Sequence, residues 1–182
     1  RILERFPSEF LIKEYPEPIS VKNSDLLEKH YTIFYGDTGY SYETIFGPYL
    51  AGAKSIEIED PYIRLPYQIQ NFIRFCEVIV KLSSIKNIDL LTGYDDELQR
   101  SEIEQKLNDL KQSLLEIDIV FEFDFNQNIH DREIRLDNGW VIKIGRGLDI
   151  YQKPQNWNDI GAYDLSLRKC LETKVDIFKT NL

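Results

Sequence analysis

Strand-like and helix-like segments alternate along most of this 182-residue chain, and this order limits the possible folds more than any other feature. Short segments in which apolar and polar residues alternate predict strands, and longer segments with apolar residues three to four positions apart predict helices that face a core. The predicted strands cover residues 30–35, 54–60, 87–92, 117–125, 129–136 and 140–144, and the predicted helices cover residues 42–52, 66–80 and 97–115. This order predicts an α/β sandwich with a mixed sheet and helices packed on it.

The last two predicted strands form a hairpin around Asp137-Asn138-Gly139. A type I′ turn needs positive φ at its central residues, which Asn and Gly adopt most readily. After the hairpin the chain is loop-like and polar, and its only remaining apolar patch covers residues 175–178.

Residues 1–24 differ from the rest of the chain, because they contain Pro7, Pro16 and Pro18 and no clean periodicity. They predict a linker, or a strap laid on the domain that residues 25–182 form. The chain has no methionine, not even at position 1, so we expect it to be a piece of a longer polypeptide with further domains.

The net charge of −9 argues against a surface that coats nucleic acid or membrane, and nucleic acid is a disfavoured partner. Residues 89–124 hold eleven acids and three bases, for which a solvated helix face is the simplest explanation. Residues 130–153 hold five bases against four acids, so an anion site fits there.

The composition argues against disulfide, metal and cofactor sites and against a membrane-spanning or secreted protein. Cys76 and Cys170 lack a CxxC spacing or a histidine partner and are expected to pack in the core. No histidine or cysteine cluster predicts a metal, and we expect no cofactor. Neither a long apolar stretch nor a signal peptide is present, so we expect a cytoplasmic protein, with peripheral attachment to a membrane as an extension of that prediction.

The segment from His130 to Asp137 carries the candidate site. On a strand, His130 and Arg132 point to the same face, and an imidazole and a guanidinium aimed at one point form a phosphate site. Asp137 sits at the turn, where a carboxylate also serves as an ordinary hairpin cap, and a backbone hydrogen bond is the structural alternative for His130.

Three further basic residues are candidates for the phosphate site. Lys143 and Arg146 would extend it, or would only solubilise a sheet edge. Arg64 would add another basic group, or would pair with Asp60. Glu133 and Arg135 fall on the opposite strand face, where an exposed ion pair is expected.

The order of His130, Arg132 and Asp137 resembles the HxKx4D motif of the phospholipase D superfamily, with Arg132 in the lysine position. Four segments together are similar to the phospholipase D-like domain at the C-terminus of MIT-domain proteins, which is also appended to bacterial Lon-like or AAA+ proteins. These segments are residues 39–50, 56–64, 71–77 and 129–149.

The resemblance implies a phospholipase D-like fold and a site that combines two motifs, which a chain with one motif builds only as a homodimer. In the superfamily the histidine attacks phosphorus and the lysine holds phosphate oxygens, whereas the eukaryotic relatives of this domain bind acidic phospholipid head groups. The glycine-serine segment of the superfamily corresponds here to Gly145-Arg146-Gly147, without the serine.

Three hypotheses follow. The first is a non-catalytic domain that binds phosphate-bearing ligands through His130, Arg132 and neighbouring bases, as a targeting or dimerisation module of a larger protein. The second is a dimeric, metal-independent phosphodiesterase or nuclease with His130 as nucleophile. The third is a structural accessory domain of a Lon-like or AAA+ protein with a vestigial site.

Overall fold

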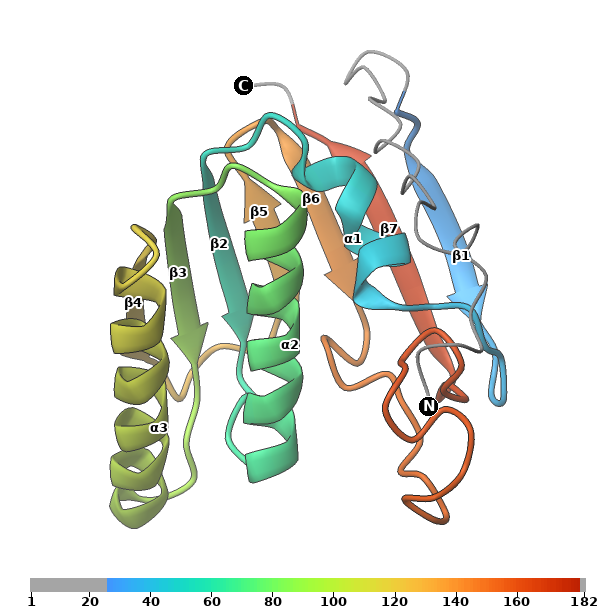
Figure 1. Cartoon of the computed structure of the whole chain (residues 1–182). Helices are drawn as coiled ribbons and strands as arrows, with labels where there is room; N and C mark the ends of the chain where they lie inside the picture. The colour runs from blue at the N-terminus through green and yellow to red at the C-terminus, as the bar shows by residue number, and fades with distance from the viewer. Residues whose placement is uncertain (1–25, 181–182) are drawn as a thin grey trace, which may run out of the picture.

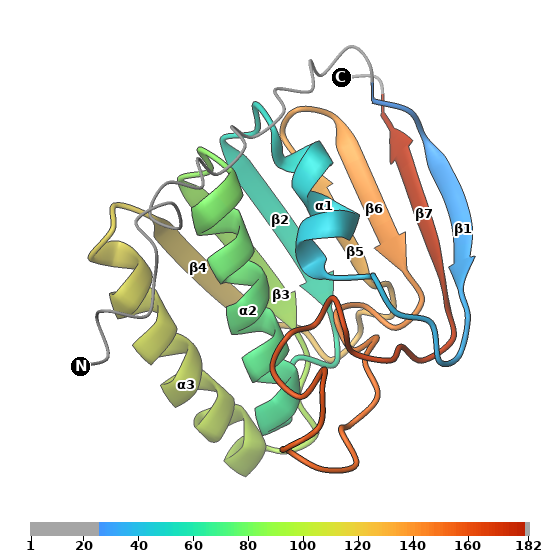
Figure 2. The same cartoon turned by 45° about the vertical axis from the view of Figure 1, so that its right-hand side comes forward.

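In the computed structural model, which describes residues 26–180, seven strands form one mixed sheet and three helices cover one face of it (Figures 1 and 2). The predicted α/β class is confirmed. The strands lie in the order β1-β7-β6-β5-β2-β3-β4. The strands are β1 (Lys29–Ile33), β2 (Ser55–Asp60), β3 (Asn87–Thr92), β4 (Val120–Phe125), β5 (Glu133–Leu136), β6 (Trp140–Ile144) and β7 (Thr173–Lys179), and the helices are α1 (Tyr42–Leu50), α2 (Pro66–Leu82) and α3 (Glu97–Leu115). The linker or strap predicted for residues 1–24 lies outside the described residues.

The sheet has a parallel half and an antiparallel half. β2, β3 and β4 are parallel and are connected through α2 and α3, whereas β5, β6, β7 and β1 pair antiparallel. β2, β5, β6 and β7 all have an end at the lower edge of the sheet in Figure 1, where β2 and β6 finish and β5 and β7 begin. The loops that meet at this edge carry most of the candidate residues.

The hairpin forms where it was predicted, but its turn is not type I′. Asp118 is the one non-glycine residue in the described range with positive φ, so Asn138 does not have the conformation that a type I′ turn needs. Gly139 has φ of 94° and its N–H donates to the Leu136 carbonyl, as in a three-residue loop that ends in a left-handed glycine.

The helix-covered face of the sheet holds the core. Apolar strand residues such as Ile56, Ile88 and Ile142 are buried against an aromatic cluster from α1 and α2. In this cluster the centroids of the Phe46 and Phe75 rings lie 4.6 Å apart. Within residues 26–180 no helix covers the opposite face, and charged side chains such as Glu57, Asp89 and Glu122 lie on it.

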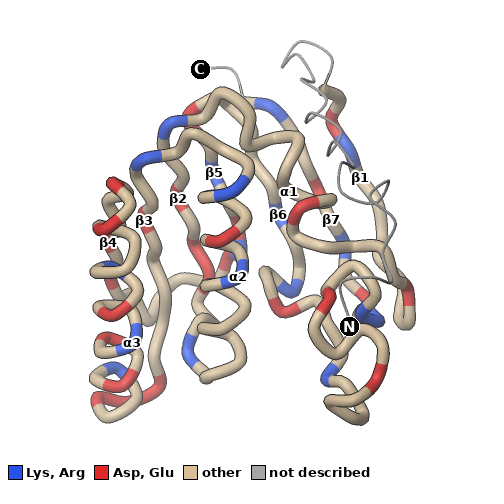
Figure 3. Tube along the Cα trace, viewed as in Figure 1, with Lys and Arg blue, Asp and Glu red and all other residues tan. Residues whose placement is uncertain are grey.

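The acidic residues of the segment 89–124 are divided between two surfaces. Some lie on the exposed side of α3, as expected, where acidic residues recur along the helix in Figure 3. Asp89, Glu122 and Asp124 instead lie on the uncovered face of the sheet, where they border a groove with Glu57 and Glu59. Asp95 and Asp96 lie in the loop between β3 and α3, at the same edge of the sheet as the end of β2.

Candidate functional site

His130 and Arg132 lie in the loop between β4 and β5, because β5 begins only at Glu133. The prediction that both residues belong to a strand is wrong, and so is the argument that a shared strand face aligns them. Both nevertheless border one shallow hollow of about 430 Å³ at the edge of the sheet. We call it the sheet-end hollow, and its lining residues are Tyr62, His130, Asp131, Arg132, Lys143, Ile144, Gly145, Lys174 and Asp176.

Asp137 lies at the other end of β5, across a strand that spans about 13 Å. Its carboxylate accepts a hydrogen bond of 2.8 Å from the Lys54 backbone N–H. The three residues of the motif therefore do not form one cluster within the chain. Asp137 ties the hairpin to the residues before β2.

Arg132 is held by Asp60, the last residue of β2, and by Tyr62, which lies two residues further along the chain. Its Nε lies 3.7 Å from Asp60 Oδ1, and the centre of its guanidinium lies 4.1 Å from the centroid of the Tyr62 ring. An aromatic ring face attracts a guanidinium, so Tyr62 and Asp60 together fix the position of Arg132. Neither Asp60 nor Tyr62 was recognised as a site residue from the sequence.

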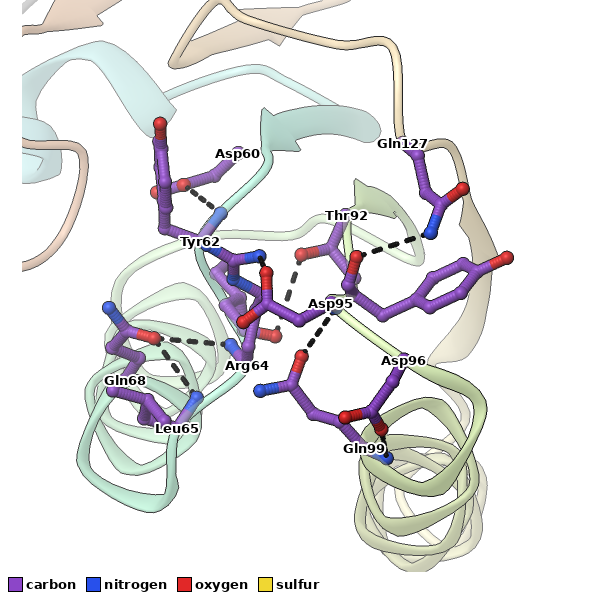
Figure 4. Close-up of polar contacts among 12 residues, drawn as sticks. Asp60, Tyr62, Arg64, Leu65, Gln68, Thr92, Asp95, Asp96, Gln99 and Gln127 are labelled. Atoms are coloured by element: carbon purple, nitrogen blue, oxygen red, sulfur yellow. Dashed lines mark hydrogen bonds and ion pairs between the residues drawn. The ribbon is translucent and has the colours of Figure 1, made fainter.

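The Asp60 side chain is an ionisable group that is buried at the edge of the core, with only 6% of its surface exposed. Its Oδ1 accepts a hydrogen bond of 2.9 Å from the Tyr62 backbone N–H (Figure 4). Burial raises the pKa of Asp60 to about 6, because this hydrogen bond and the charge of Arg132 offset the loss of water only in part. The Asp149 carboxylate raises the pKa further, and the charge of Arg64 lowers it.

Arg64 does not pair with Asp60, which corrects one of the two alternatives for this residue. It forms an ion pair with Asp95, in the loop that follows β3 (Figure 4). The centre of its guanidinium lies 4.9 Å from the centroid of the Tyr62 ring, outside the lining of the sheet-end hollow. Arg64 therefore supports the Tyr62 loop and is not a lining residue.

Lys143 borders the hollow, and its Nζ lies 2.8 Å from Glu133 Oε2. This contact raises the pKa of Lys143. Glu133 also pairs with Arg135, as expected, but the prediction that the pair is exposed is wrong for Glu133, which is buried beneath both bases.

The positions of two further bases near the edge, Lys174 and Arg146, were not predicted. Lys174 of β7 borders the hollow, but β7 was not recognised as a strand. Arg146, for which an extension of the His130 site was one of two alternatives, lines a different pocket. His130 and Lys174 have no ion-pair or hydrogen-bonding side-chain partner within residues 26–180, whereas Asp176 of the hollow bonds to His30 at 3.0 Å.

Other classes of site find no support in the part of the chain that the structure describes. No group of three or more His, Cys, Asp or Glu side chains within residues 26–180 is arranged to hold a metal ion. Cys76 and Cys170 are buried free thiols. Over the same residues, no helix combines the length and the apolar character needed to cross a bilayer.

Comparison with known proteins identifies relatives over most of the chain. Residues 39–179 match the family model described as the phospholipase D-like domain at the C-terminus of MIT. MIT domain-containing protein 1 of Mus musculus is 48% identical over 143 residues, which cover 78% of this chain and 57% of the mouse protein. The chain thus corresponds to little more than half of that relative's length.

A comparison of folds finds TrmBL2, an archaeal chromatin protein described as having a novel mode of DNA binding. The match has a TM-score of 0.38 and 13% sequence identity, and it covers 83% of this chain and 46% of that chain.

Proposed function

Because the chain belongs to the family of phospholipase D-like domains found at the C-terminus of MIT, we propose that its sheet-end hollow binds phosphate-bearing ligands, with acidic phospholipid head groups as the main class. In this proposal the domain is a targeting and dimerisation module of a larger protein. The proposal rests chiefly on the gathering of His130, Arg132, Lys143 and Lys174 around one hollow in a chain of net charge −9.

The Arg132 guanidinium is well placed to donate hydrogen bonds to phosphate. Its contact with Asp60 is 3.7 Å long, which is an ion pair without a hydrogen bond. The Tyr62 ring holds the guanidinium without using its N–H groups. Arginine presents these donors in a planar fork that fits two phosphate oxygens.

His130 and Lys174 form no ion pair within the described residues, and the carboxylates of Asp131 and Asp176 line the same hollow. Lys143 is less available, because Glu133 already contacts its ammonium group. A head-group phosphate would therefore be bound mainly by Arg132, Lys174 and His130. Each basic side chain near an anionic membrane surface contributes about 1 kcal/mol to binding.

Binding is favoured over hydrolysis by the surroundings of His130. A histidine that acts as nucleophile or base is normally oriented by a second polar group within hydrogen-bonding distance. Within residues 26–180 His130 has no such group, and Asp137 lies at the far end of β5. Turnover of a chromogenic phosphodiester that is lost in His130→Asn would support the dimeric enzyme instead.

The test of the proposal is the binding of the protein to vesicles of phosphatidylcholine with phosphatidylserine, compared with vesicles of phosphatidylcholine alone. Lys174→Gln is expected to bind the acidic vesicles about fivefold more weakly, in line with the loss of about 1 kcal/mol for one base at the surface. Co-sedimentation across a range of lipid concentrations measures this shift.

Lys106→Gln is the matched control, because it removes the same charge from an exposed position on α3. It is expected to bind as the wild type does. Equal losses in the two variants would indicate a response to net charge alone and would contradict a site at the sheet-end hollow.

A further inference from the structure

Three arginines line a second pocket, and its lining residues come from α2 and from the segment between β6 and β7. The pocket has a volume of about 510 Å³, which is within the range of small-molecule sites. Arg74 comes from α2, and Arg146 and Arg168 come from the segment between β6 and β7. We call this space the arginine pocket.

These three arginines differ from the others in their partners. The other four arginines of residues 26–180 each form an ion pair with a carboxylate, and the pairs are Arg64–Asp95, Arg100–Glu97, Arg132–Asp60 and Arg135–Glu133. In the same range, Arg74, Arg146 and Arg168 have no ion-pair partner.

The arginines of the pocket donate hydrogen bonds to uncharged oxygens instead. Arg74 donates to Asn71 Oδ1 at 3.0 Å, and Arg146 Nε donates to the Asp149 backbone carbonyl at 3.0 Å. Arg168 donates to the backbone carbonyls of residues 152, 161 and 162. Since the whole chain has 31 acidic and 22 basic residues, carboxylates are not scarce, and the pocket keeps its positive charge because few of them lie there.

Arg168 is the most constrained of the three, with 8% of its surface exposed. Burial and the nearby charge of Arg74 both lower its pKa. A buried guanidinium that faces another cation is destabilised unless an anion compensates the charge. Asp149 is the one acidic residue of the pocket, and its carboxylate accepts a hydrogen bond from the Tyr67 hydroxyl at 3.3 Å.

Aromatic side chains complete the lining of the pocket. Trp157 and Tyr67 both contribute to it, and each is about half exposed. An exposed indole or phenol face stacks on a flat ring of a ligand. Guanidiniums for phosphate oxygens and aromatic faces for a planar ring together match the chemistry of a nucleotide.

We propose that the arginine pocket binds a nucleoside di- or triphosphate, with the phosphates among Arg74, Arg146 and Arg168 and the base against Trp157. This site uses none of the residues assigned to the sheet-end hollow, so it goes beyond the proposed lipid-binding function.

Intrinsic fluorescence gives a direct test with ADP as the probe. The chain has two tryptophans, of which Trp140 is buried in the core and Trp157 is 51% exposed at the pocket. Titration with ADP is expected to change the emission of Trp157. In Trp157→Phe the change should disappear, while calorimetry still detects weaker binding.

The arginine variants test the phosphate contacts. Arg74→Gln and Arg146→Gln are each expected to weaken ADP binding about tenfold, which corresponds to about 1.4 kcal/mol for one lost charged contact. Arg100→Gln is the matched control, because it removes an arginine from α3 that pairs with Glu97, and it should bind ADP normally. Thermal unfolding of each variant checks that it is folded.

Three results would overturn the proposal: no binding of ADP by the wild type, an equal loss in Arg100→Gln, or inorganic phosphate bound as tightly as ADP. The two proposed sites are separable, because Lys174→Gln should keep ADP binding and Arg74→Gln should keep binding to acidic vesicles. Failure of one site then leaves the other intact.

Discussion

Gly147→Ala is expected to lower the free energy of unfolding by about 3 kcal/mol, because two separate effects act at this position. Gly147 has φ of 59°, in the left-handed region that residues with a side chain adopt at a cost. A methyl group there would also overlap the buried Asp60 carboxylate and would lie 3.2 Å from Arg132 Cδ. The substitution therefore displaces the pair that positions Arg132 at the sheet-end hollow.

Urea denaturation of the wild type and of Gly147→Ala measures the loss, and Gly36→Ala is the control. Gly36 also has positive φ, 87°, but no atom lies within 4 Å of the position of an added methyl group. Gly36→Ala should therefore lower the free energy of unfolding only through the strained backbone conformation, by about 1 kcal/mol. An equal decrease in the free energy of unfolding of both variants would show that a methyl group at Gly147 does not overlap Asp60.

Asp60→Asn is expected to raise the free energy of unfolding at neutral pH by about 2 kcal/mol, and the gain should vanish near pH 4. The pKa of Asp60 is about 6 in the folded protein, above its ordinary value of 3.8. Between these values the folded state holds a proton that the unfolded state has released, so the wild type loses stability as pH rises through this range. Asparagine remains neutral and still accepts the Tyr62 N–H.

The full shift of the pKa, in which the attraction to Arg132 is already included, corresponds to about 3 kcal/mol and is the upper limit of the expected gain. Urea denaturation at about pH 4, where Asp60 is protonated in the folded protein, and at about pH 7.5, where it is ionised, measures the gain in both states. Asp89→Asn, at an exposed position on the uncovered sheet face, is the control and should change stability little at either pH. A constant difference between Asp60→Asn and the wild type at both pH values would contradict a raised pKa for Asp60.

The elements with strong periodicity were predictable from the sequence. α3 has the predicted bounds, and α2 begins at the predicted Pro66 and extends only two residues beyond the expected end. Ser41 lies directly before the predicted start of α1 and caps the helix, since its side chain accepts a hydrogen bond from Thr44 N–H. Periodic burial and local capping are properties of neighbouring residues, so they can be read from one chain.

The errors concern elements that depend on distant partners. The alternation in residues 129–136 favoured a strand throughout, but β2 ends at Asp60 and offers no pairing partner to residues 129–131. Loss of this pairing places His130 and Arg132 in a loop. β7 was missed because only a short apolar patch marks it, although pairing with β1 and β6 stabilises it from both sides.

The candidate site was predictable in part. His130, Arg132 and Lys143 were named from the sequence and do border one hollow, and Arg146 and Arg64 were named but lie elsewhere. Asp60 and Lys174 were missed, because their importance depends on burial and on strand order. The shortage of carboxylates around Arg74 and Arg168 is a property of the folded chain and has no signature in the sequence.

The central claim, a phosphate site at the sheet-end hollow, is tested most directly by the backbone amide shifts of the isotope-labelled protein in a titration with glycerophosphoserine, a soluble phospholipid head group. The account predicts that the shifts concentrate on the amides of residues 130–132, Gly145 and Lys174, and that they weaken in Arg132→Gln. Shifts that are absent there, or that lie only on α3 or the uncovered sheet face, would contradict it.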